Sequence, residues 1–306
     1  MNFEGRDIVS IKDFSKPDIE YLMSITDMME AIARGGSEML KGKILATLFF
    51  EPSTRTKLSF ESAMYRLGGN CIGFTESSST SIEKGENLAD TVKVVENYAD
   101  VLVIRHPQEG AARLASELSN IPIINAGSGS EEHPTQALLD LYTIKKEFKK
   151  LDKLTIALVG DLRYGRTVHS LAYALSLFDA KLYLVSPELL KMREEVVGEI
   201  KDKIEVEEEN DLKEILPELD IIYMTRIQKE RFPDLSEYEM VKGTYRLTQD
   251  DLKNVKRKAI VMHPLPRIDE IAFDVDSTHH ARYFKQTWYG LLVRMALLSL
   301  ILGGLE

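Results

Sequence analysis

The chain has 306 residues, 44% of them hydrophobic and 29% charged, which is the composition of a globular protein with a sizeable core. Its length favours two domains, because domains typically contain about 100 to 200 residues. The formal net charge of -10 argues against general binding to nucleic acids or anionic membranes, so any anion site must be local. The single cysteine, Cys71, excludes an intramolecular disulfide framework or a cysteine zinc cluster and fits a cytoplasmic location.

Short apolar runs rich in Val, Ile and Leu predict the strands of the protein in chain order. They lie at residues 44–50, 101–105, 121–125, 154–160, 181–186, 220–225 and 259–265. Strands that are apolar at successive positions are typical of parallel sheets covered on both faces. We therefore expect an α/β protein of two domains, each a mainly parallel sheet flanked by helices.

Helical spacing of apolar residues appears between these runs. It predicts amphipathic helices around residues 60–67 and 168–175, and a third over 134–148, where Pro134 suits the first turn. The charged stretch KKEFKKLDK then precedes a fresh strand. We place the domains there, with residues 1–147 as the first domain and 148–287 as the second.

The C-terminal segment, residues 288–306, predicts a buried helix that packs back on the first domain. Its apolar part runs from Leu291 to Leu302 and contains Arg294, so it is shorter than the ~20 residues needed to span a bilayer. The N-terminus lacks a cationic segment followed by a long apolar one, and we expect no secretory signal.

Three hydroxyls and an arginine follow the first predicted strand, in the sequence Ser53-Thr54-Arg55-Thr56. Ligands of open parallel sheets gather at the carboxyl ends of the strands, where helices begin. The N–H groups at a helix start favour an anion, and the arginine fork matches phosphate. An ordinary helix cap beside a surface arginine explains the motif equally well when it is taken alone.

Other predicted strands also end in polar groups. Arg105 ends the second run, His133 and Gln136 follow the third, and His263-Pro264-Leu265-Pro266 ends the last. Each is explained by itself as a turn, a cap or a surface pair. Their recurrence at strand ends, where a substrate site is expected, favours an anion-binding site.

The stretch GDLRYGRT, residues 160–167, is a near match to the phosphate-binding loop of nucleotide hydrolases. Arg166 replaces the lysine of that loop, and no acidic strand end suited to magnesium is evident. The alternative role of Arg166 is to bind a substrate carboxylate through a bidentate pair. Arg226 and Gln228, two residues apart after another strand, point the same way if extended, although a solvated loop is the simpler interpretation. No metal site is expected, because no His-Glu-x-x-His pattern occurs.

The ordered set FEPSTRTKLSFE, KGENLADT, RHPQEGAARLA, NAGSGSEEHPTQALLDL, GDLRYGRTVHSL, TRIQKERF and HPLPRIDEI covers nearly the whole chain. It resembles the aspartate/ornithine carbamoyltransferase family, and its aspartate branch in particular. The resemblance implies an enzyme that joins carbamoyl phosphate and L-aspartate into N-carbamoyl-L-aspartate and phosphate, an early step of de novo pyrimidine (UMP) biosynthesis. It implies no cofactor.

The resemblance also implies roles for individual residues. Carbamoyl phosphate is expected to contact Ser53, Thr54, Arg55, Thr56, Arg105, His133, Gln136, Leu265 and Pro266, with the Leu265-Pro266 bond cis. Aspartate is expected to contact Lys84, Arg166, Arg226 and Gln228. The residues expected to act in catalysis are Arg55, Thr56, Lys84, Arg105 and His133.

Assembly is implied as well. Family members are homotrimers in which a serine and a lysine of one loop enter the neighbouring site. Lys84 matches that lysine, whereas Ser81 matches the serine only with a one-residue deletion before Lys84. Some members also assemble with a zinc-bearing regulatory chain, and here such zinc would have to come from the partner.

Three alternatives stay open at this point. The first is a carbamoyltransferase for another amino acid such as ornithine, against which His263-Pro264-Leu265-Pro266 and the Arg226-x-Gln228 pattern argue. The second is a P-loop-like nucleotide hydrolase, and the third is an anion sensor without catalysis. For the transferase we expect direct attack of the aspartate amine on the carbamoyl carbon, with no obvious general base among the side chains.

Overall fold

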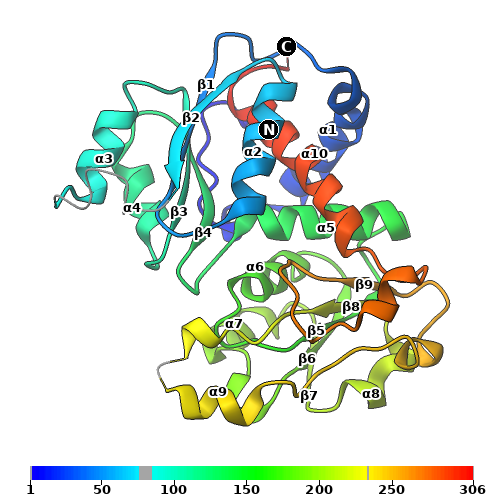
Figure 1. Ribbon diagram of the computed structural model, residues 1–306. Coiled ribbons are helices and arrows are strands. Elements are labelled where there is room, and N and C mark those ends of the chain that lie inside the picture. The colour runs from blue at the N-terminus through cyan, green and yellow to red at the C-terminus, as the bar shows by residue number, and fades with distance from the viewer. Residues whose placement is uncertain (1, 76–84, 233, 306) are drawn as a thin grey trace. The chain divides into compact units, whose positions relative to one another are not determined.

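The computed structural model describes residues 2–75, 85–232 and 234–305. The chain divides into two compact units (Figure 1). Unit 1 consists of Met1–Tyr142 and Trp288–Glu306, and unit 2 of Thr143–Thr287. The boundaries fall inside two long helices, α5 (Pro134–Phe148) and α10 (Tyr283–Ile301).

The described part of unit 1 contains a four-stranded parallel sheet with the strand order β2-β1-β3-β4. Ala46 and Leu48 of the central β1 share one face with residues of α3 and α4, which cover that side. Such burial explains why β1 is apolar along its length. The strands are β1 (Ile44–Phe49), β2 (Asn70–Thr75), β3 (Val101–His106) and β4 (Ile123–Ser128), and the helices include α1 (Lys16–Gly35), α2 (Thr54–Arg66), α3 (Leu88–Val95) and α4 (Ala111–Leu118).

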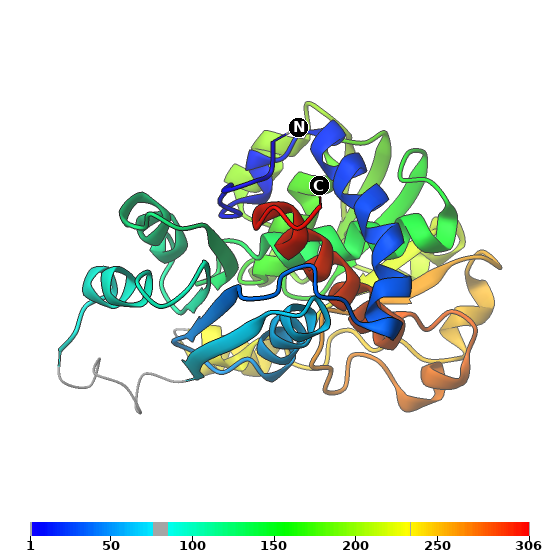
Figure 2. The ribbon, with the colours of Figure 1, turned by 90° about the horizontal axis from the view of Figure 1, so that it is seen from above.

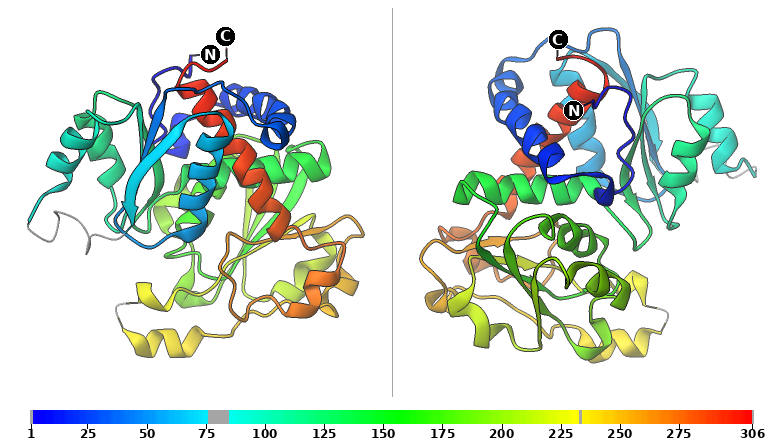
Figure 3. Two further views of the ribbon diagram at one scale, coloured as in Figure 1. Left: turned by 45° about the horizontal axis from the view of Figure 1, so that its top comes forward. Right: turned by 180° about the vertical axis from the view of Figure 1, so that it is seen from behind.

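The C-terminal helix α10 packs in unit 1, between α1 and α2 (Figures 1 and 2). A Cβ added at Gly290 would lie 2.9 Å from Leu139 Cδ2, so α10 passes close to α5. The Gly5 N–H donates to the Ile301 carbonyl at 3.0 Å, which joins the segments near the two chain ends (Figure 3). The predicted return of this helix to the first domain is confirmed. Among the described residues, no helix has the length and apolar character that crossing a membrane requires.

Unit 2, in its described part, contains a five-stranded parallel sheet with the order β7-β6-β5-β8-β9. One face of β5 and β8 packs with Leu212 and Ile215 of α8 in a core that extends to Tyr283. The strands are β5 (Leu154–Val159), β6 (Ala180–Val185), β7 (Glu205–Glu209), β8 (Ile221–Met224) and β9 (Ile260–Met262), and the helices include α6 (Arg166–Leu175), α7 (Glu194–Ile200), α8 (Leu212–Ile215) and α9 (Leu235–Val241).

Each predicted apolar run contains or overlaps a strand, and α5 has the bounds predicted for it. Two strands, β2 and β7, were not predicted. Both lie at a sheet edge and expose many of their side chains, so their sequences lack the continuous apolar character of a buried strand. The last run was predicted too long, because β9 ends at Met262 and His263 begins a loop.

Gly73 permits the pairing of β2 with β1. Its φ is +143°, and an added Cβ would lie 2.2 Å from the Thr47 carbonyl oxygen. We expect Gly73→Ala to lower the free energy of unfolding by about 1 to 3 kcal/mol, because backbone must move to admit the methyl group. Denaturant unfolding measures this, with Gly35→Ala as the control in the same unit, since nothing lies within 4 Å of a Cβ there. Equal stability of both variants would contradict the packing argument.

Candidate active site

Helix α2 begins without a side-chain cap. Ser53 is the N-cap residue, yet its side chain makes no capping hydrogen bond. At the start of α1, by contrast, the Ser15 hydroxyl accepts from the Asp18 N–H at 3.3 Å. The ordinary-cap interpretation of Ser53 is therefore wrong for its side chain. Backbone N–H groups at a helix start that no side chain caps favour an anion.

Arg105 lies beside this helix start because β1 and β3 are neighbours. Phe49 at the end of β1 pairs with Arg105 at the end of β3. The Arg105 Nη1 donates to the Ala126 carbonyl at 3.2 Å, and its Nε lies 2.8 Å from Glu51 Oε1. The partly buried guanidinium group of Arg105 therefore lies next to the loop that leads into α2.

His133 and Gln136 occupy the turn that begins α5, and both are buried. The His133 carbonyl accepts from the Gln136 N–H at 3.0 Å. Glu132, the residue before them, accepts from Ser10 Oγ at 2.5 Å and from the Ile11 N–H at 2.8 Å, and burial raises its pKa. The turn is therefore tied to the N-terminal segment.

Unit 1 thus brings together the described side chains predicted to bind carbamoyl phosphate, except those of Leu265 and Pro266, which belong to unit 2. They follow β1, β3 and β4, which are adjacent in the sheet. Thr56 is buried, while Thr54 and Arg55 are exposed. The predicted loop residues Ser81 and Lys84 lie outside the described residues.

Unit 2 places Arg166, Arg226 and Gln228 at the ends of the adjacent strands β5 and β8. Arg166 begins α6 and is 9% exposed. Gln228 Nε2 donates to the Tyr164 carbonyl at 3.4 Å, in the loop before Arg166. The two loops predicted to hold carboxylates are therefore in direct contact.

Asp161 joins these two loops. Its carboxylate accepts from the Tyr164 N–H at 2.9 Å and from the Gln228 N–H at 3.4 Å, while its own N–H donates to Thr225 Oγ1 at 3.2 Å. Burial raises its pKa to about 6, against the opposing hydrogen bonds and the positive charge of Arg226. The sequence reasoning missed Asp161, although its place directly after an apolar run and Gly160 was a usable signal.

The guanidinium group of Arg226 already pairs with a carboxylate of the protein. Its Nη1 donates to Glu230 Oε2 at 3.1 Å, and Nη2 pairs with Oε1 of the same residue. The hydrogen bond from Arg226 lowers the pKa of Glu230. The fork is thus oriented for bidentate carboxylate binding.

The loop after β9 holds Leu265 and Pro266 in unit 2. Leu265 has a φ of +56°, and the Leu265-Pro266 bond is cis. The Leu265 N–H donates to His263 Nδ1 at 2.7 Å, and His263 Nε2 lies 2.6 Å from Glu270 Oε1. Burial opposes ionisation of Glu270, but the hydrogen bond from His263 lowers its pKa. His263 and Glu270 therefore brace the loop, a role that the sequence did not indicate.

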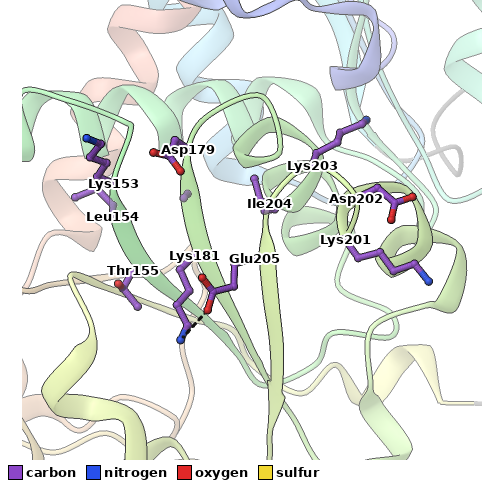
Figure 4. A pocket seen from close by; sticks show the side chains of 11 residues that line it. Lys153, Leu154, Thr155, Asp179, Lys181, Lys201, Asp202, Lys203, Ile204 and Glu205 are labelled. Carbon is purple, nitrogen blue, oxygen red and sulfur yellow. Dashed lines mark ion pairs between the residues drawn. The ribbon is translucent and has the colours of Figure 1, made fainter.

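A hollow of about 650 Å³ lies at the opposite, amino ends of β5 and β6 (Figure 4). The amines of Lys153, Lys201 and Lys203 point away from one another there, and Lys181 pairs with Glu205 at 3.1 Å. Nothing converges on a ligand, so we assign this hollow no role. The described ranges also contain no cluster of three or more His, Cys, Asp or Glu suited to a metal ion.

Cationic and hydroxyl groups at the carboxyl ends of two parallel sheets define an α/β protein built to bind small anions. Residues 6–146 match the family model described as aspartate/ornithine carbamoyltransferase, carbamoyl-P binding domain. Residues 152–301 match the Asp/Orn binding domain of the same description. The chain belongs to the aspartate/ornithine carbamoyltransferase family.

Individual relatives agree with this result. A Thermococcus kodakarensis protein named aspartate carbamoyltransferase catalytic subunit is 60% identical, over 99% of each chain. The solved Trypanosoma cruzi aspartate transcarbamoylase, in complex with carbamoyl phosphate and aspartate, is 40% identical with a TM-score of 0.94, over 98% of each chain. The catalytic subunit of M. jannaschii aspartate transcarbamoylase is 52% identical with a TM-score of 0.88, over 96% of this chain and 97% of that one.

Asp161 makes stability depend on pH. The pKa of its carboxyl group is about 6 in the folded protein and 3.8 in an unperturbed aspartate, so the native protein binds this proton more tightly than the unfolded chain. Its contribution to the free energy of unfolding is therefore full below pH 4 and falls, by about 3 kcal/mol in all, as the pH rises through 6 to about 7. Relative to the wild type, Asp161→Asn should gain about that much stability between pH 4 and pH 7. Urea unfolding at several pH values tests this, and a constant difference would refute it.

Proposed function

We propose that this chain is the catalytic chain of an aspartate carbamoyltransferase. It converts carbamoyl phosphate and L-aspartate into N-carbamoyl-L-aspartate and phosphate, an early step of de novo pyrimidine biosynthesis. The observation that carries the proposal is the 60% identity, over 99% of both chains, to a relative named for this activity. The groups at the strand ends of both units support it.

In this proposal, unit 1 binds carbamoyl phosphate. Ser53, Thr54 and the first N–H groups of α2 hold the phosphate together with Arg55, which fits the uncapped helix start. Arg105, His133 and Gln136 hold the carbamoyl group, with Leu265 and Pro266 of unit 2 as further contacts. Thr56, which is buried, reaches both the phosphate and the carbonyl oxygen.

Aspartate binding is assigned to unit 2, with Arg166, Arg226 and Gln228 for its two carboxylates. Two arginines suit a dicarboxylate, whereas ornithine would bring an ammonium group to one of them. The bidentate pair of Arg226 with Glu230 supports the assignment, because it orients this fork for a carboxylate. Lys84 is the further residue assigned to aspartate.

The reaction proceeds by direct attack of the neutral α-amine on the carbamoyl carbon. A C–N bond forms and the bond from carbon to the phosphate oxygen breaks. Thr56, Arg105 and His133 donate to the carbonyl oxygen as it becomes an oxyanion. The phosphate group, bound to Arg55, is the leaving group and takes the proton of the amine. Positioning and charge suffice for these steps, and the mechanism requires no cofactor.

The purified chain should form carbamoyl aspartate in a colorimetric assay, and Arg55→Ala should lose about 100-fold or more in turnover. Arg34→Ala should keep wild-type turnover, because this exposed arginine pairs with Glu30 at 3.2 Å in the last turn of α1, and the chain that follows it bonds to the C-terminal end of α2. Ornithine and a nucleoside triphosphate with magnesium serve as substrate controls. Carbamoylation of ornithine alone, or phosphate release without aspartate, would favour the other functions, and near-normal turnover by Arg55→Ala would remove its role.

A homotrimer with shared sites completes the proposal. Strand β2 is an edge strand, and Ile72 in it is exposed, as are Leu58 and Tyr65 of α2. Exposed apolar groups beside an unpaired edge favour burial against another chain. Lys84, and Ser81 with it, follow β2 in the sequence and are the residues assigned to the neighbouring site.

Mixing Lys84→Ala chains with Arg55→Ala chains should restore activity. In a ring of three, every trimer with both chain types has one site whose Arg55 and Lys84 are both intact, so about a third of wild-type turnover is expected. Mixed trimers are separated by a charge tag before assay. Inactive mixed trimers would show that no site takes Arg55 from one chain and Lys84 from the next.

Further assembly and location belong to the same proposal. The relatives are named catalytic subunits, which supports a partner of another kind. We assign that partner the role of a zinc-bearing regulatory chain that brings its own metal, because Cys71 is the only cysteine here. The half-buried free thiol of Cys71 is compatible with work in the cytoplasm.

A further inference from the structure

Arg294 of α10 is a buried cation in unit 1. Burial lowers its pKa to about 10, although the charge of Asp140 opposes this. Its Nη1 donates to Ser59 Oγ of α2 at 2.8 Å, and its guanidinium lies 5.0 Å from the centre of the Phe60 ring. A buried charge requires charge of opposite sign nearby, and the charge of Asp140, on α5, stabilises the cation.

Asp140 in turn holds the side chain of Gln136, one helical turn earlier in α5. Gln136 Nε2 donates to Asp140 Oδ1 at 2.9 Å, and Asp140 is fully buried. A carboxylate that carries no proton can only accept hydrogen bonds, and the charge of Arg294 attracts such a carboxylate. The amide of Gln136 must therefore turn its NH₂ group to Asp140.

In this orientation the amide oxygen of Gln136, Oε1, is available to accept a hydrogen bond from a ligand. Among the described residues, no protein group is seen to donate to that oxygen. An amide that could flip would present a donor as readily as an acceptor. The hydrogen bond to Asp140 prevents this flip. The fixed orientation of the amide matters only for ligands that carry a hydrogen-bond donor at the position facing Gln136.

We propose that Asp140, backed by Arg294, is a positioning residue that fixes Gln136 with its oxygen toward the ligand and so selects an acyl phosphate carrying an NH₂ group. The inference rests on the proposed function and deepens it. Carbamoyl phosphate has the NH₂ group, whereas acetyl phosphate has a methyl group of similar size in its place. The fixed oxygen accepts from the first and has no partner in the second.

The selectivity is measured as the inhibition constant of acetyl phosphate divided by the KM of carbamoyl phosphate, at saturating aspartate. In Asp140→Asn the new amide can donate or accept, so the amide of Gln136 is free to flip. The KM of carbamoyl phosphate should then rise about 2-fold, because only one of the two amide orientations accepts from the NH₂ group, while the acetyl phosphate constant stays the same. A purely structural role of Asp140 would raise both constants together and leave the ratio unchanged.

Three further variants make the test decisive. Gln136→Leu removes the acceptor altogether and should lower the selectivity further, by about 3- to 10-fold, the value of one lost hydrogen bond. Ser59→Ala removes the other hydrogen bond of Arg294 and should keep the wild-type ratio. Asp140→Asn combined with Arg294→Gln leaves no unpaired buried charge, and it replaces the single variant if that one does not fold.

The outcomes separate the two proposals. A wild-type protein that forms no carbamoyl aspartate refutes the proposed function itself. If the wild type is active, an unchanged ratio in the folded Asp140 variants overturns only the inference about Asp140. A ratio that falls in these variants and in Gln136→Leu, but not in Ser59→Ala, supports it.

Discussion

Parallel pairing of the strands is the constraint on which the candidate site depends. Because the strands of each sheet run the same way, their carboxyl ends meet at one edge, and every loop that leaves this edge can reach its neighbours. In unit 1 the residues after β1, β3 and β4 meet there, and in unit 2 those after β5 and β8 do so. Both units therefore bring their polar side chains together by the same arrangement of parallel strands.

Buried carboxylates then fix these groups in place. Asp161 ties the loops of unit 2 through backbone N–H groups, and Glu132 ties the His133 turn to the N-terminal segment. Burial raises the pKa of both carboxyls, so keeping them ionised at neutral pH costs stability. The fold therefore holds its site geometry with charges that a protein selected for stability alone would omit.

The sequence predicted the fold well where local pattern determines structure. Helix α5 and the central strands have strong apolar periodicity, whereas the edge strands β2 and β7 are partly exposed and gave no such signal. For the candidate site, the sequence identified polar residues at strand ends, but not the partners that hold them. That Ser53 caps nothing, or that Arg294 meets Ser59, depends on contacts set by the tertiary fold and not by sequence spacing.

Under the proposed function, two of the cations in the candidate site meet their substrates by exchanging one anion for another. Arg105 lies against Glu51 in unit 1, and Arg226 against Glu230 in unit 2. A cation that already has a carboxylate partner needs less desolvation when a substrate replaces that partner than a fully hydrated one would. The exchange also favours ligands whose oxygens match the guanidinium fork as well as a carboxylate does. In a chain with a net charge of -10, such internal pairs keep the cations in place without attracting unrelated anions.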